Sequence, residues 1–371
     1  MIMKIAFAIF KYFPWGGLQK DLIRTMSEVA ARGHEVTCFT GSWEGDVPSF
    51  LNLRLLSLKK HSNHARAEEF ETLFIQTVKN EHFDRTVTFN RIGGADFYFA
   101  GDDCFATAFA KRKNFLLRLL PRYRIFLQQE KNILDPASDT HILYLDQRQK
   151  KDYMAYYGTQ EERFTLLPPT GDPKCMRNDH TLCLRKEKRS ELNLIDDQIL
   201  LISVAADFHC KGIDRTLNVF ASLPGEIRKN CVLCLIGGND PKRREQFIKQ
   251  SEQLGIKQQT IFAGPRDDVY AYLAAADLMV HPARKEATGT VLAEALASGV
   301  PVICSAVCGY ASMVGEAGVV IPEPFDAKNF GNLLVETLKS LPRYKEKAME
   351  LSGTLDFTRR AAIAADVITS K

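Results

Sequence analysis

Short runs of apolar and β-branched residues alternate with helix-like patterns along nearly the whole chain of 371 residues. Residues 4–10 predict a strand, and residues 18–32 predict a helix whose single apolar stripe ends at Gly33. This alternation constrains the fold strongly, because parallel strands joined by helices form a sheet that is covered on both faces. The sequence therefore predicts an α/β fold of doubly wound, Rossmann-like sheets.

The other predicted elements follow the same rhythm. In the first half we expect strands at 34–40, 53–58, 85–89 and 141–145, with helices between several of them. In the second half we expect strands at 199–204, 232–236, 260–263, 278–281, 302–304 and 319–321. Helices in the second half are expected at about 213–222, 241–253, 267–275, 289–298 and 327–340.

One segment interrupts the alternation and predicts a domain boundary. Pro168, Pro169 and Pro173 lie close together, and a polar, Lys/Arg-rich stretch continues from there to about Asn193, which makes this segment the predicted linker. We expect an N-terminal domain of residues 1–167 and a C-terminal domain of residues 168–352. A helix at about 353–371 is expected to pack back onto the first domain. The two domains are expected to face a central cleft, because ligands of such sheets bind at the carboxyl ends of the strands.

Charge and cysteine content exclude several classes of protein. With 49 Lys and Arg against 45 Asp and Glu, the net charge of +4 does not favour a general nucleic-acid binder, and no nucleic acid is expected as a partner. The nine cysteines are odd in number and scattered, which indicates free thiols rather than a disulfide framework. Cys231 and Cys234 form a C-x-x-C, but on a strand they point to opposite faces, so no metal is expected there.

Neither of the two uncharged stretches is expected to be a membrane segment. The apolar run after Lys4 is short and is interrupted by Lys11, so we expect no export signal. Residues 295–315 carry no charge, but glycine and proline break them into short pieces, so we expect them to form core.

Paired glycines lie in the first predicted strand-to-helix turn. Gly16 and Gly17 would let the backbone approach a ligand, and the helix N-terminus behind them would present free N–H groups to an anion. The turn lacks the G-x-G-x-x-G fingerprint of dinucleotide sites. A tight structural turn is the alternative, and these residues alone leave both interpretations open.

Two glutamates flank another predicted helix start. Glu286 lies in the loop after the strand that ends at His281, and Glu294 lies about one turn inside the helix, for which a threonine hydroxyl at 288 or 290 is the expected N-cap. The helix N-terminus attracts phosphate, whereas carboxylates repel it. Hydroxyl groups on either side of a diphosphate, as in a nucleotide sugar, are therefore the expected partners. The alternative is one solvated glutamate and one partner of the helix dipole.

Lys211 lies in a third candidate loop, before Gly212 and a predicted helix start. A lysine in that place can neutralise a leaving diphosphate, although a solvated loop lysine is the alternative. The chain contains no D-x-D pair for a metal-bound diphosphate and no G-x-S-x-G nucleophile elbow of hydrolases.

Taken in order, these segments resemble the retaining glycosyltransferases of family 4, which have a GT-B fold of two Rossmann-like domains. The resemblance rests on the Gly16-Gly17 turn, on Lys211-Gly212, on residues 262–266 and on the E-x7-E pair of Glu286 and Glu294. Further segments are similar to the subgroup of lipopolysaccharide core glucosyltransferases, namely residues 11–21, 42–46, 121–124 and 305–310. The similarity extends from the first strand to about Pro324.

The resemblance implies a donor site for a nucleotide sugar in the C-terminal domain. Glu286 would hold hydroxyls of the donor hexose, Glu294 would hold the ribose hydroxyls, and Arg266 would help to frame the uracil. Lys211 would stabilise the leaving diphosphate together with backbone amides in two loops. The donor-binding residues of those loops would be Gly16, Gly17, Thr288, Gly289, Thr290 and Val291.

The resemblance also makes the N-terminal domain the acceptor side. Asp21 matches the polar position just after the glycine loop, and Asp102 would face the acceptor hydroxyl or the reacting sugar. With Glu286 and Lys211, these two aspartates form the expected catalytic set. The chain departs from the family at two positions: Cys210 stands where an arginine is usual, and Thr170 stands where a glycine is usual.

The expected activity is the retaining transfer of glucose from UDP-glucose to a lipid A-linked heptose of the lipopolysaccharide inner core, a step that begins the outer core. No metal and no cofactor are expected, since the chain has no D-x-D pair for a metal-bound diphosphate. The resemblance also implies that no protein base is required, because the leaving diphosphate itself would take the acceptor proton during a front-face attack. Two alternatives stay open. One is another nucleotide-sugar enzyme of this fold, such as a mannosyl- or N-acetylglucosaminyltransferase or a UDP-N-acetylglucosamine 2-epimerase. The other is a membrane-docked sugar-binding protein without catalysis.

A basic amphipathic segment is predicted between residues 111 and 131. Its basic residues are Lys111, Arg112, Lys113, Arg118, Arg122, Arg124 and Lys131, against the single acid Glu130. At helical spacing its apolar side chains share one face, with a break expected at Pro121; they are Phe115, Leu116, Leu119, Leu120, Tyr123, Phe126 and Leu127. Such a segment can bind an anionic membrane in the plane of its surface, although a packed helix with solvated arginines is the alternative. We therefore expect a cytoplasmic protein bound peripherally to the cytoplasmic face of the inner membrane.

Overall fold

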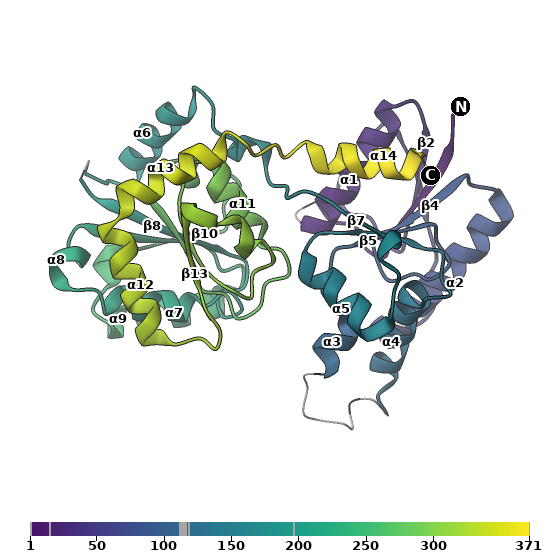
Figure 1. The fold of residues 1–371 in the computed structure, drawn as a ribbon, viewed down its shortest axis with the longest axis horizontal. Helices are drawn as coiled ribbons and strands as arrows, with labels where there is room; N and C mark the ends of the chain where they lie inside the picture. Colours follow the sequence, from purple (N-terminus) through teal and green to yellow (C-terminus); the bar gives the residue numbers. More distant parts are fainter. Residues whose placement is uncertain (1, 15, 111–116, 118, 196, 371) are drawn as a thin grey trace. The chain divides into compact units, whose positions relative to one another are not determined.

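The computed structural model describes residues 2–14, 16–110, 117, 119–195 and 197–370, and it divides the chain into two compact units (Figure 1). The first unit consists of Met1–Pro168 and Thr358–Lys371, and the second consists of Pro169–Phe357. The boundary falls between two adjacent prolines, neither of which has a backbone N–H that could continue a sheet or a helix.

The first unit holds, within the described residues, a seven-stranded parallel sheet of order β3-β2-β1-β4-β5-β6-β7. Its strands are β1 (Lys4–Ile9), β2 (Glu35–Thr40), β3 (Leu51–Leu55), β4 (Arg85–Thr88), β5 (Phe97–Ala100), β6 (His141–Tyr144) and β7 (Phe164–Leu166). The strand order reverses at β1, where Phe7 pairs with Cys38 of β2 on one side and with Val87 of β4 on the other. Such a switch point is where α/β sheets bind ligands.

Helices cover this sheet. They are α1 (Gly17–Ala31), α2 (Asn63–Glu81), α3 (Phe105–Ala110), α4 (Pro121–Leu134), α5 (Gln147–Tyr157) and α14 (Arg359–Ser370). The apolar stripe predicted for α1 is confirmed, since Leu22, Met26 and Val29 are fully buried in one core with β1 and with Ala364 and Ile368 of α14. Helix α14 thereby joins the last residues of the chain to the first unit (Figure 1).

A buried ion pair fixes α14 to α1. Asp21 of α1 and Arg360 of α14 are both buried, and Arg360 Nη1 lies 3.0 Å from Asp21 Oδ2. Burial raises the pKa of Asp21, against the opposing positive charges of Arg360 and Arg24. Arg360 Nε also donates to the carbonyl oxygen of Pro168, so the same side chain holds the last residue before the unit boundary.

Replacement of Asp21 by alanine is therefore expected to destabilise the first unit by about 3 kcal/mol, because it leaves a buried guanidinium without its counter-charge. Thermal unfolding should show a transition several degrees lower, and the double variant Asp21→Leu/Arg360→Met should recover most of the loss. An unchanged unfolding curve for Asp21→Ala would show that this pair does not hold α14.

The second unit holds, within the described residues, a six-stranded parallel sheet of order β10-β9-β8-β11-β12-β13. Its strands are β8 (Ile199–Ala205), β9 (Cys231–Gly237), β10 (Thr260–Gly264), β11 (Leu278–His281), β12 (Val302–Ser305) and β13 (Gly318–Ile321). Its helices are α6 (Thr181–Glu191), α7 (Ile213–Ala221), α8 (Gly225–Arg228), α9 (Pro241–Gln253), α10 (Val269–Ala275), α11 (Thr290–Ala297), α12 (Ala327–Lys339) and α13 (Leu341–Ser352). The strands and helices predicted for this half are confirmed to within two residues at each end.

Two further predictions for this unit are confirmed. Cys231 and Cys234 are free thiols on β9, and they belong to different hydrophobic clusters, as expected for opposite faces of a strand. The uncharged residues 295–315 form the end of α11, β12 and mostly buried turns. Among the described residues, no helix is both long and apolar enough to cross a membrane.

The prediction of a linker up to Asn193 is wrong, because this stretch contains helix α6, which packs on α10. Three of its cations, Arg185, Lys188 and Arg189, are partly or fully buried and form ion pairs. Arg185 Nη2 lies 2.7 Å and Arg189 Nη1 lies 3.1 Å from the carboxylate oxygens of Asp277, which is 3% exposed. Burial would raise the pKa of Asp277, but the charges of Arg185 and Lys345 hold that pKa below its ordinary value.

Strands β5 and β7 were not predicted, and β3 begins two residues earlier than predicted. The four residues of β5 are all buried between β4 and β6, so their place in the sheet comes from strand pairing and not from an alternating pattern. Strand β7 has only three residues and lies at the edge of the sheet.

Candidate functional site

The loop between β11 and α11 in the second unit brings a carboxylate to a lysine. Glu286 lies five residues after the buried His281, whose Nε2 donates to Glu286 Oε2 over 3.1 Å. Lys211 Nζ, from the loop between β8 and α7, lies 2.7 Å from the same carboxylate oxygen. Both side chains of this ion pair keep some exposure, 23% for Lys211 and 13% for Glu286, so a ligand can reach them.

The surroundings of Glu286 keep it negatively charged. Burial would raise the pKa of Glu286, but the hydrogen bond from His281 and the positive charge of Lys211 hold that pKa below its ordinary value. An ionised carboxylate accepts hydrogen bonds only, so the partner that it favours in a ligand is a hydroxyl or another donor.

Arg284 joins the two loops that carry this pair. Its guanidinium forms a double hydrogen bond with Asp214 of α7, with both N–O distances at 2.7 Å, and it also donates to the carbonyl oxygen of His209. The backbone N–H of Arg284 donates to the carbonyl oxygen of Cys210 over 2.9 Å. His281, Arg284 and Asp214 were not predicted as site residues. For Arg284 the only signal in the sequence is its position two residues before Glu286.

Gly212 allows the two loops to approach each other. Its φ is +74°, and a Cβ atom at this position would lie 2.1 Å from the carbonyl oxygen of Pro282. Any other residue would therefore push the loop of Lys211 away from the loop of Glu286.

The N-terminus of α11 lies between Glu286 and Glu294. Helix α11 begins at Thr290, and its N-cap is Gly289 with a φ of +85° and no side-chain hydrogen bond. The prediction of a threonine hydroxyl as N-cap is therefore wrong, because the left-handed turn at Gly289 takes the place of the cap. The N–H groups of Thr290 and Val291 belong to the first helical turn and have no acceptor within the helix, so they can bind an anion. The carbonyl oxygen of Thr288 accepts a hydrogen bond from the N–H of Tyr310.

Glu294 contacts the first residues of the second unit, near Asp172. The backbone N–H of Asp172 donates to Glu294 Oε1 over 2.9 Å. A Cβ atom on Gly171 would lie 2.6 Å from Glu294 Cγ and 2.7 Å from a ring carbon of Phe357, so only glycine permits this approach. Thr170, which departs from the family pattern, is buried and donates its hydroxyl to the carbonyl oxygen of Phe357.

Arg266 follows a different strand of the sheet from those that precede Lys211 and Glu286. It follows β10, which is the edge strand and is separated from β8 by β9. Its Nε lies 3.2 Å from Asp268 Oδ1, and its guanidinium lies 5.5 Å from the ring centroid of Tyr272. Its expected contact with a base stays a prediction.

In the first unit, the glycine turn stands at the start of α1. Gly16 is the N-cap, and a Cβ atom there would lie 1.9 Å from Gln19 Oε1 and 2.6 Å from a ring carbon of Phe13, so another residue would have to displace both side chains. Among the described residues, a Cβ atom on Gly17 would meet no atom within 4 Å. Asp21 lies one turn further along, in its buried pair with Arg360, and its catalytic role stays a prediction.

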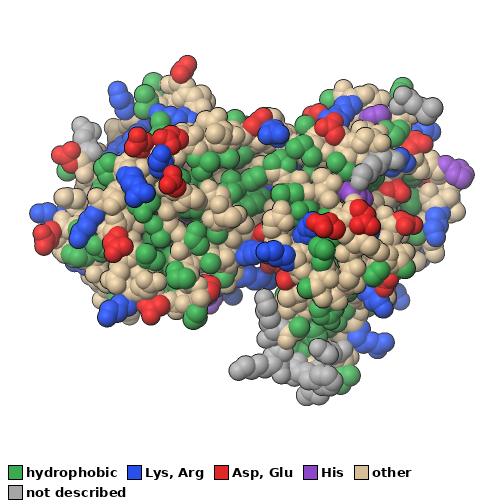
Figure 2. All heavy atoms as spheres, in the orientation of Figure 1, with side chains coloured by type: hydrophobic (Ala, Val, Ile, Leu, Met, Phe, Trp, Pro, Cys, Tyr) green, Lys and Arg blue, Asp and Glu red, His purple; other side chains and the backbone are tan. Residues whose placement is uncertain are grey.

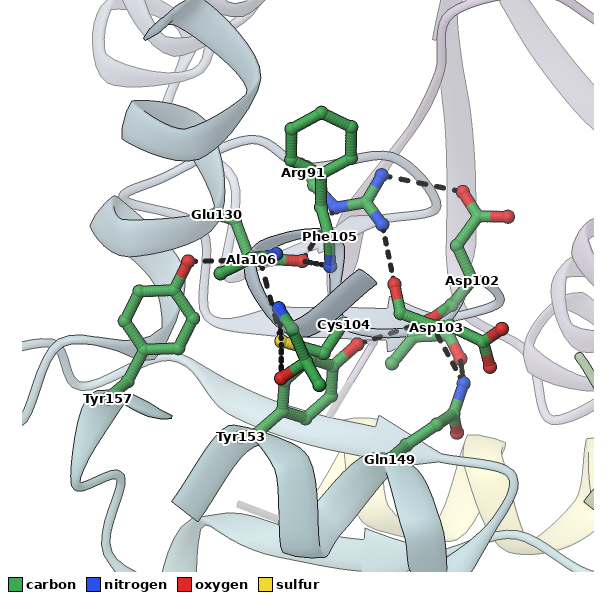
Figure 3. Close-up of polar contacts among 12 residues, drawn as sticks. Arg91, Asp102, Asp103, Cys104, Phe105, Ala106, Glu130, Gln149, Tyr153 and Tyr157 are labelled. Carbon is green, nitrogen blue, oxygen red and sulfur yellow. Dashed lines mark hydrogen bonds and ion pairs between the residues drawn. The ribbon is translucent and has the colours of Figure 1, made fainter. Parts of the chain in front are cut away.

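Asp102 follows β5 and is held in a network that Figure 3 shows. Gln149 Nε2 and Tyr153 OH of α5 donate to its backbone carbonyl over 3.0 and 3.2 Å. Its carboxylate is 67% exposed and lies 3.5 Å from Arg91 Nη1. Arg91 in turn donates through Nε to Glu130, which is 1% exposed.

Glu130 connects the helices around Asp102 (Figure 3). Its carboxylate accepts hydrogen bonds from the N–H groups of Phe105 and Ala106 at the start of α3, and from Tyr157 OH. Glu130 was predicted only as the single acid of the basic segment, and Arg91 was not predicted as a site residue. The contact between them joins residues 39 positions apart, and no local pattern indicates it.

The basic segment is only partly described. Lys111, Arg112, Lys113, Phe115, Leu116 and Arg118 lie outside the described residues. Pro121 is the first residue of α4, where the predicted break falls, and Arg122 and Arg124 are exposed in its first turn. Figure 2 shows hydrophobic side chains gathered over α3 and α4.

The predicted single apolar face is wrong for the described residues, because it divides at the start of α4. Tyr123 and Phe126 pack against α3, with ring centroids 4.7 Å from Phe109 and 5.7 Å from Phe105, respectively. Leu119 and Leu120, in contrast, are 68% and 48% exposed.

Comparison with known proteins gives relatives over the whole chain. Residues 185–350 match the family described as glycosyl transferases group 1. The chain is 39% identical over 372 aligned positions to the lipopolysaccharide glucosyltransferase WaaG of Escherichia coli (strain K12), covering 99% of each protein. A crystal structure of WaaG, a glycosyltransferase involved in lipopolysaccharide biosynthesis, matches with a TM-score of 0.88 and 38% identity over 99% of this chain and 100% of the other. The structure of Anabaena HepE in complex with UDP and glucose matches with a TM-score of 0.72 at 14% identity, over 99% of this chain and 98% of the other, which shows a common fold.

Proposed function

Because the chain belongs to the group 1 glycosyl transferases, within the family of the lipopolysaccharide glucosyltransferase WaaG, we propose that it transfers glucose from UDP-glucose to a heptose of the lipopolysaccharide inner core with retention of configuration. The membership establishes a hexosyltransferase of the GT-B fold that acts in lipopolysaccharide biosynthesis. The proposal adds the donor, the acceptor and the stereochemistry.

The observation that carries the proposal is the Lys211–Glu286 pair beside the N-terminus of α11. A nucleoside diphosphate sugar offers an anionic diphosphate and a hexose rich in hydroxyls, and this site offers one partner for each. Lys211 and the N–H groups of Thr290 and Val291 would bind the diphosphate, and the ionised Glu286 would accept hydrogen bonds from the hexose.

In the proposed reaction, the bond between the anomeric carbon and the diphosphate oxygen breaks, and the acceptor hydroxyl oxygen forms a bond to that carbon on the same face. The acceptor proton passes to the departing diphosphate oxygen, so UDP leaves and no protein base is consumed. Lys211 would supply positive charge where negative charge develops on the diphosphate. Such electrostatic stabilisation of the transition state is usually the largest single contribution to an enzyme's rate enhancement. Glu286 and Asp102 would align the two sugars.

We also propose that the enzyme needs no metal and no cofactor. The sequence contains no D-x-D pair of the kind that holds a metal-bound diphosphate. Lys211 and the helix N-terminus can take over the neutralisation of charge that such a metal would provide.

A panel of nucleotide sugars tests the donor. Binding to the folded state raises the unfolding temperature, and at one fixed concentration a tighter ligand raises it more. UDP and UDP-glucose are expected to stabilise the chain, whereas GDP-mannose is not. Stabilisation by GDP-mannose alone would contradict the proposed donor, and stabilisation by UDP-N-acetylglucosamine without UDP-glucose would favour a different UDP-sugar enzyme.

We further propose that the chain works on the cytoplasmic face of the inner membrane, bound peripherally to anionic lipid. The exposed side chains Leu119, Leu120, Arg122 and Arg124 at the start of α4 support this proposal, because apolar groups next to cations suit an anionic interface.

The variant Arg118→Gln/Arg122→Gln/Arg124→Gln is expected to bind anionic vesicles about 100-fold more weakly, since each basic residue near such a surface contributes roughly 1 kcal/mol. Co-sedimentation with anionic and with neutral vesicles measures this loss. A control variant, Lys242→Gln/Arg243→Gln/Lys249→Gln, removes the same charge from exposed positions on α9 and should bind like the wild type. Equal losses in the two variants would show that only net charge matters.

A further inference from the structure

A cavity of 320 Å³ opens in the first unit, where β1 and β4 end. Its walls include Phe10, Phe70 and Phe126, and three cations reach it, namely Lys11, Arg91 and Arg122. Phe10 and Lys11 directly follow β1, and Arg91 follows β4, so the cavity lies at the switch point of the sheet. That is where a sheet of this kind binds its ligand.

The charged side chains that line this cavity are all positive. Among the described residues that line it, the other polar groups are the neutral Asn63, Asn90 and Gln129, and there is no carboxylate. Arg91 is already paired with Glu130 and Asp102. The unbalanced positive charge therefore comes from Lys11 and Arg122, and from Arg66 nearby. Lys11 and Arg66 lie 5.7 and 5.9 Å from the centroid of the same Phe10 ring, so two like charges meet at one side chain.

Two helices line the cavity with one side each. Three residues of α2 and three of α4 reach it at spacings of four and three positions, so each set lies on one face of its helix. These residues are Asn63, Ala67 and Phe70 on α2, and Arg122, Phe126 and Gln129 on α4. The walls are therefore formed by ordered helix faces, and the positive charge comes from the side chains.

The aromatic walls favour a ligand with a ring of its own. Phe10 and Phe126 are partly exposed, and the Arg122 guanidinium lies 5.8 Å from the Phe126 ring centroid. Apolar walls with a few directed polar groups are typical of sites for small organic ligands. A sugar ring that carries an acidic group fits both the aromatic walls and the cations.

We propose that this cavity binds a carboxylated or phosphorylated sugar of the acceptor saccharide. The inference rests on the proposed function, because it makes the first unit the acceptor side. Arg91 lies between the cavity and Asp102, with its Nη1 3.5 Å from the Asp102 carboxylate. Binding of the acidic sugar in the cavity would therefore fix the neighbouring acceptor hydroxyl relative to Asp102.

The test uses the full chain and a deacylated core oligosaccharide, which carries the acidic sugars of lipopolysaccharide without its lipid. Calorimetry gives the Kd of this probe and of a neutral form in which carboxyl groups are reduced and phosphates are removed. The cavity variant is Lys11→Gln/Arg122→Gln. The control variant, Lys20→Gln/Lys79→Gln, removes the same charge from exposed residues of α1 and α2 that do not line the cavity.

The cavity variant is expected to bind the anionic oligosaccharide at least about ten-fold more weakly than the wild type, and the control variant is expected to bind it like the wild type. The neutral oligosaccharide should bind both variants equally. An equal loss in the two variants, or an unchanged Kd in the cavity variant, would overturn the proposal. A cavity variant that loses only its affinity for anionic vesicles would assign these cations to a lipid headgroup and would overturn it as well.

The binding measurement is independent of turnover. If the wild type binds the anionic oligosaccharide through the cavity but transfers no glucose to it, the proposed reaction fails and the cavity assignment stands. If glucose is transferred and the cavity variant has an unchanged KM for the anionic acceptor, the cavity assignment fails and the proposed reaction stands.

Discussion

Replacement of Lys211 by methionine is expected to lower kcat by roughly 100- to 1,000-fold, the range observed when one group that stabilises developing negative charge is removed. Methionine keeps the length and much of the packing of lysine and removes its charge. The KM for the acceptor should change little, because Lys211 belongs to the second unit and to the proposed donor site. Steady-state measurement of UDP release gives both constants.

Lys285→Met is the matched control for this variant. Lys285 lies one residue before Glu286, and the structure shows only its backbone carbonyl in contact with Lys211, over 3.4 Å. Its side chain is exposed, and kcat should stay within about two-fold of the wild type, as for most surface substitutions. Equal losses in the two variants would contradict a specific role for Lys211 and would point to the general positive charge of the loop.

The two glutamates beside α11 are expected to differ in what they contribute to binding. Glu294→Gln should weaken the binding of UDP itself by roughly 10- to 100-fold, because a charged acceptor of the ribose hydroxyls is lost. Glu286→Gln should leave the affinity for UDP nearly intact and reduce the turnover of UDP-glucose, because its proposed partner is the hexose. Calorimetry with UDP and steady-state kinetics with UDP-glucose separate these effects.

Glutamine is the informative replacement at both positions. Its amide oxygen can still accept the N–H of Asp172 at position 294 and the Nε2–H of His281 at position 286, so the local fold should be kept. Equal losses of UDP affinity in the two variants would contradict the division of roles between sugar and ribose.

The second sheet and its loops were largely predictable from the sequence. The strand before Glu286 is short and apolar, and the glutamates at 286 and 294 flank a helix start, so the pattern placed both carboxylates beside one helix N-terminus. The cap could not be predicted, because Gly289 closes the helix through a left-handed turn that involves no side-chain oxygen. The pairing of Lys211 with Glu286 also could not be predicted, because it depends on loops that approach each other at Gly212.

Two of the errors have a common physical cause, which is that charged residues become buried when distant partners neutralise them. Helix α6 was predicted as a linker because of its lysines and arginines, yet Arg185 and Arg189 pack on Asp277 about 90 residues later. Glu130 was counted as the single acid of a basic, membrane-facing segment, yet it is buried against Arg91. A single sequence shows the charge of each residue but not its partner.

The most direct test of the account is the reaction itself. The purified chain is incubated with UDP-glucose and with a lipopolysaccharide whose core ends at its heptoses, and both UDP and the saccharide are analysed. We expect UDP to be released in step with the addition of one α-linked glucose to a heptose. Release of no UDP, together with an unmodified saccharide, would contradict it.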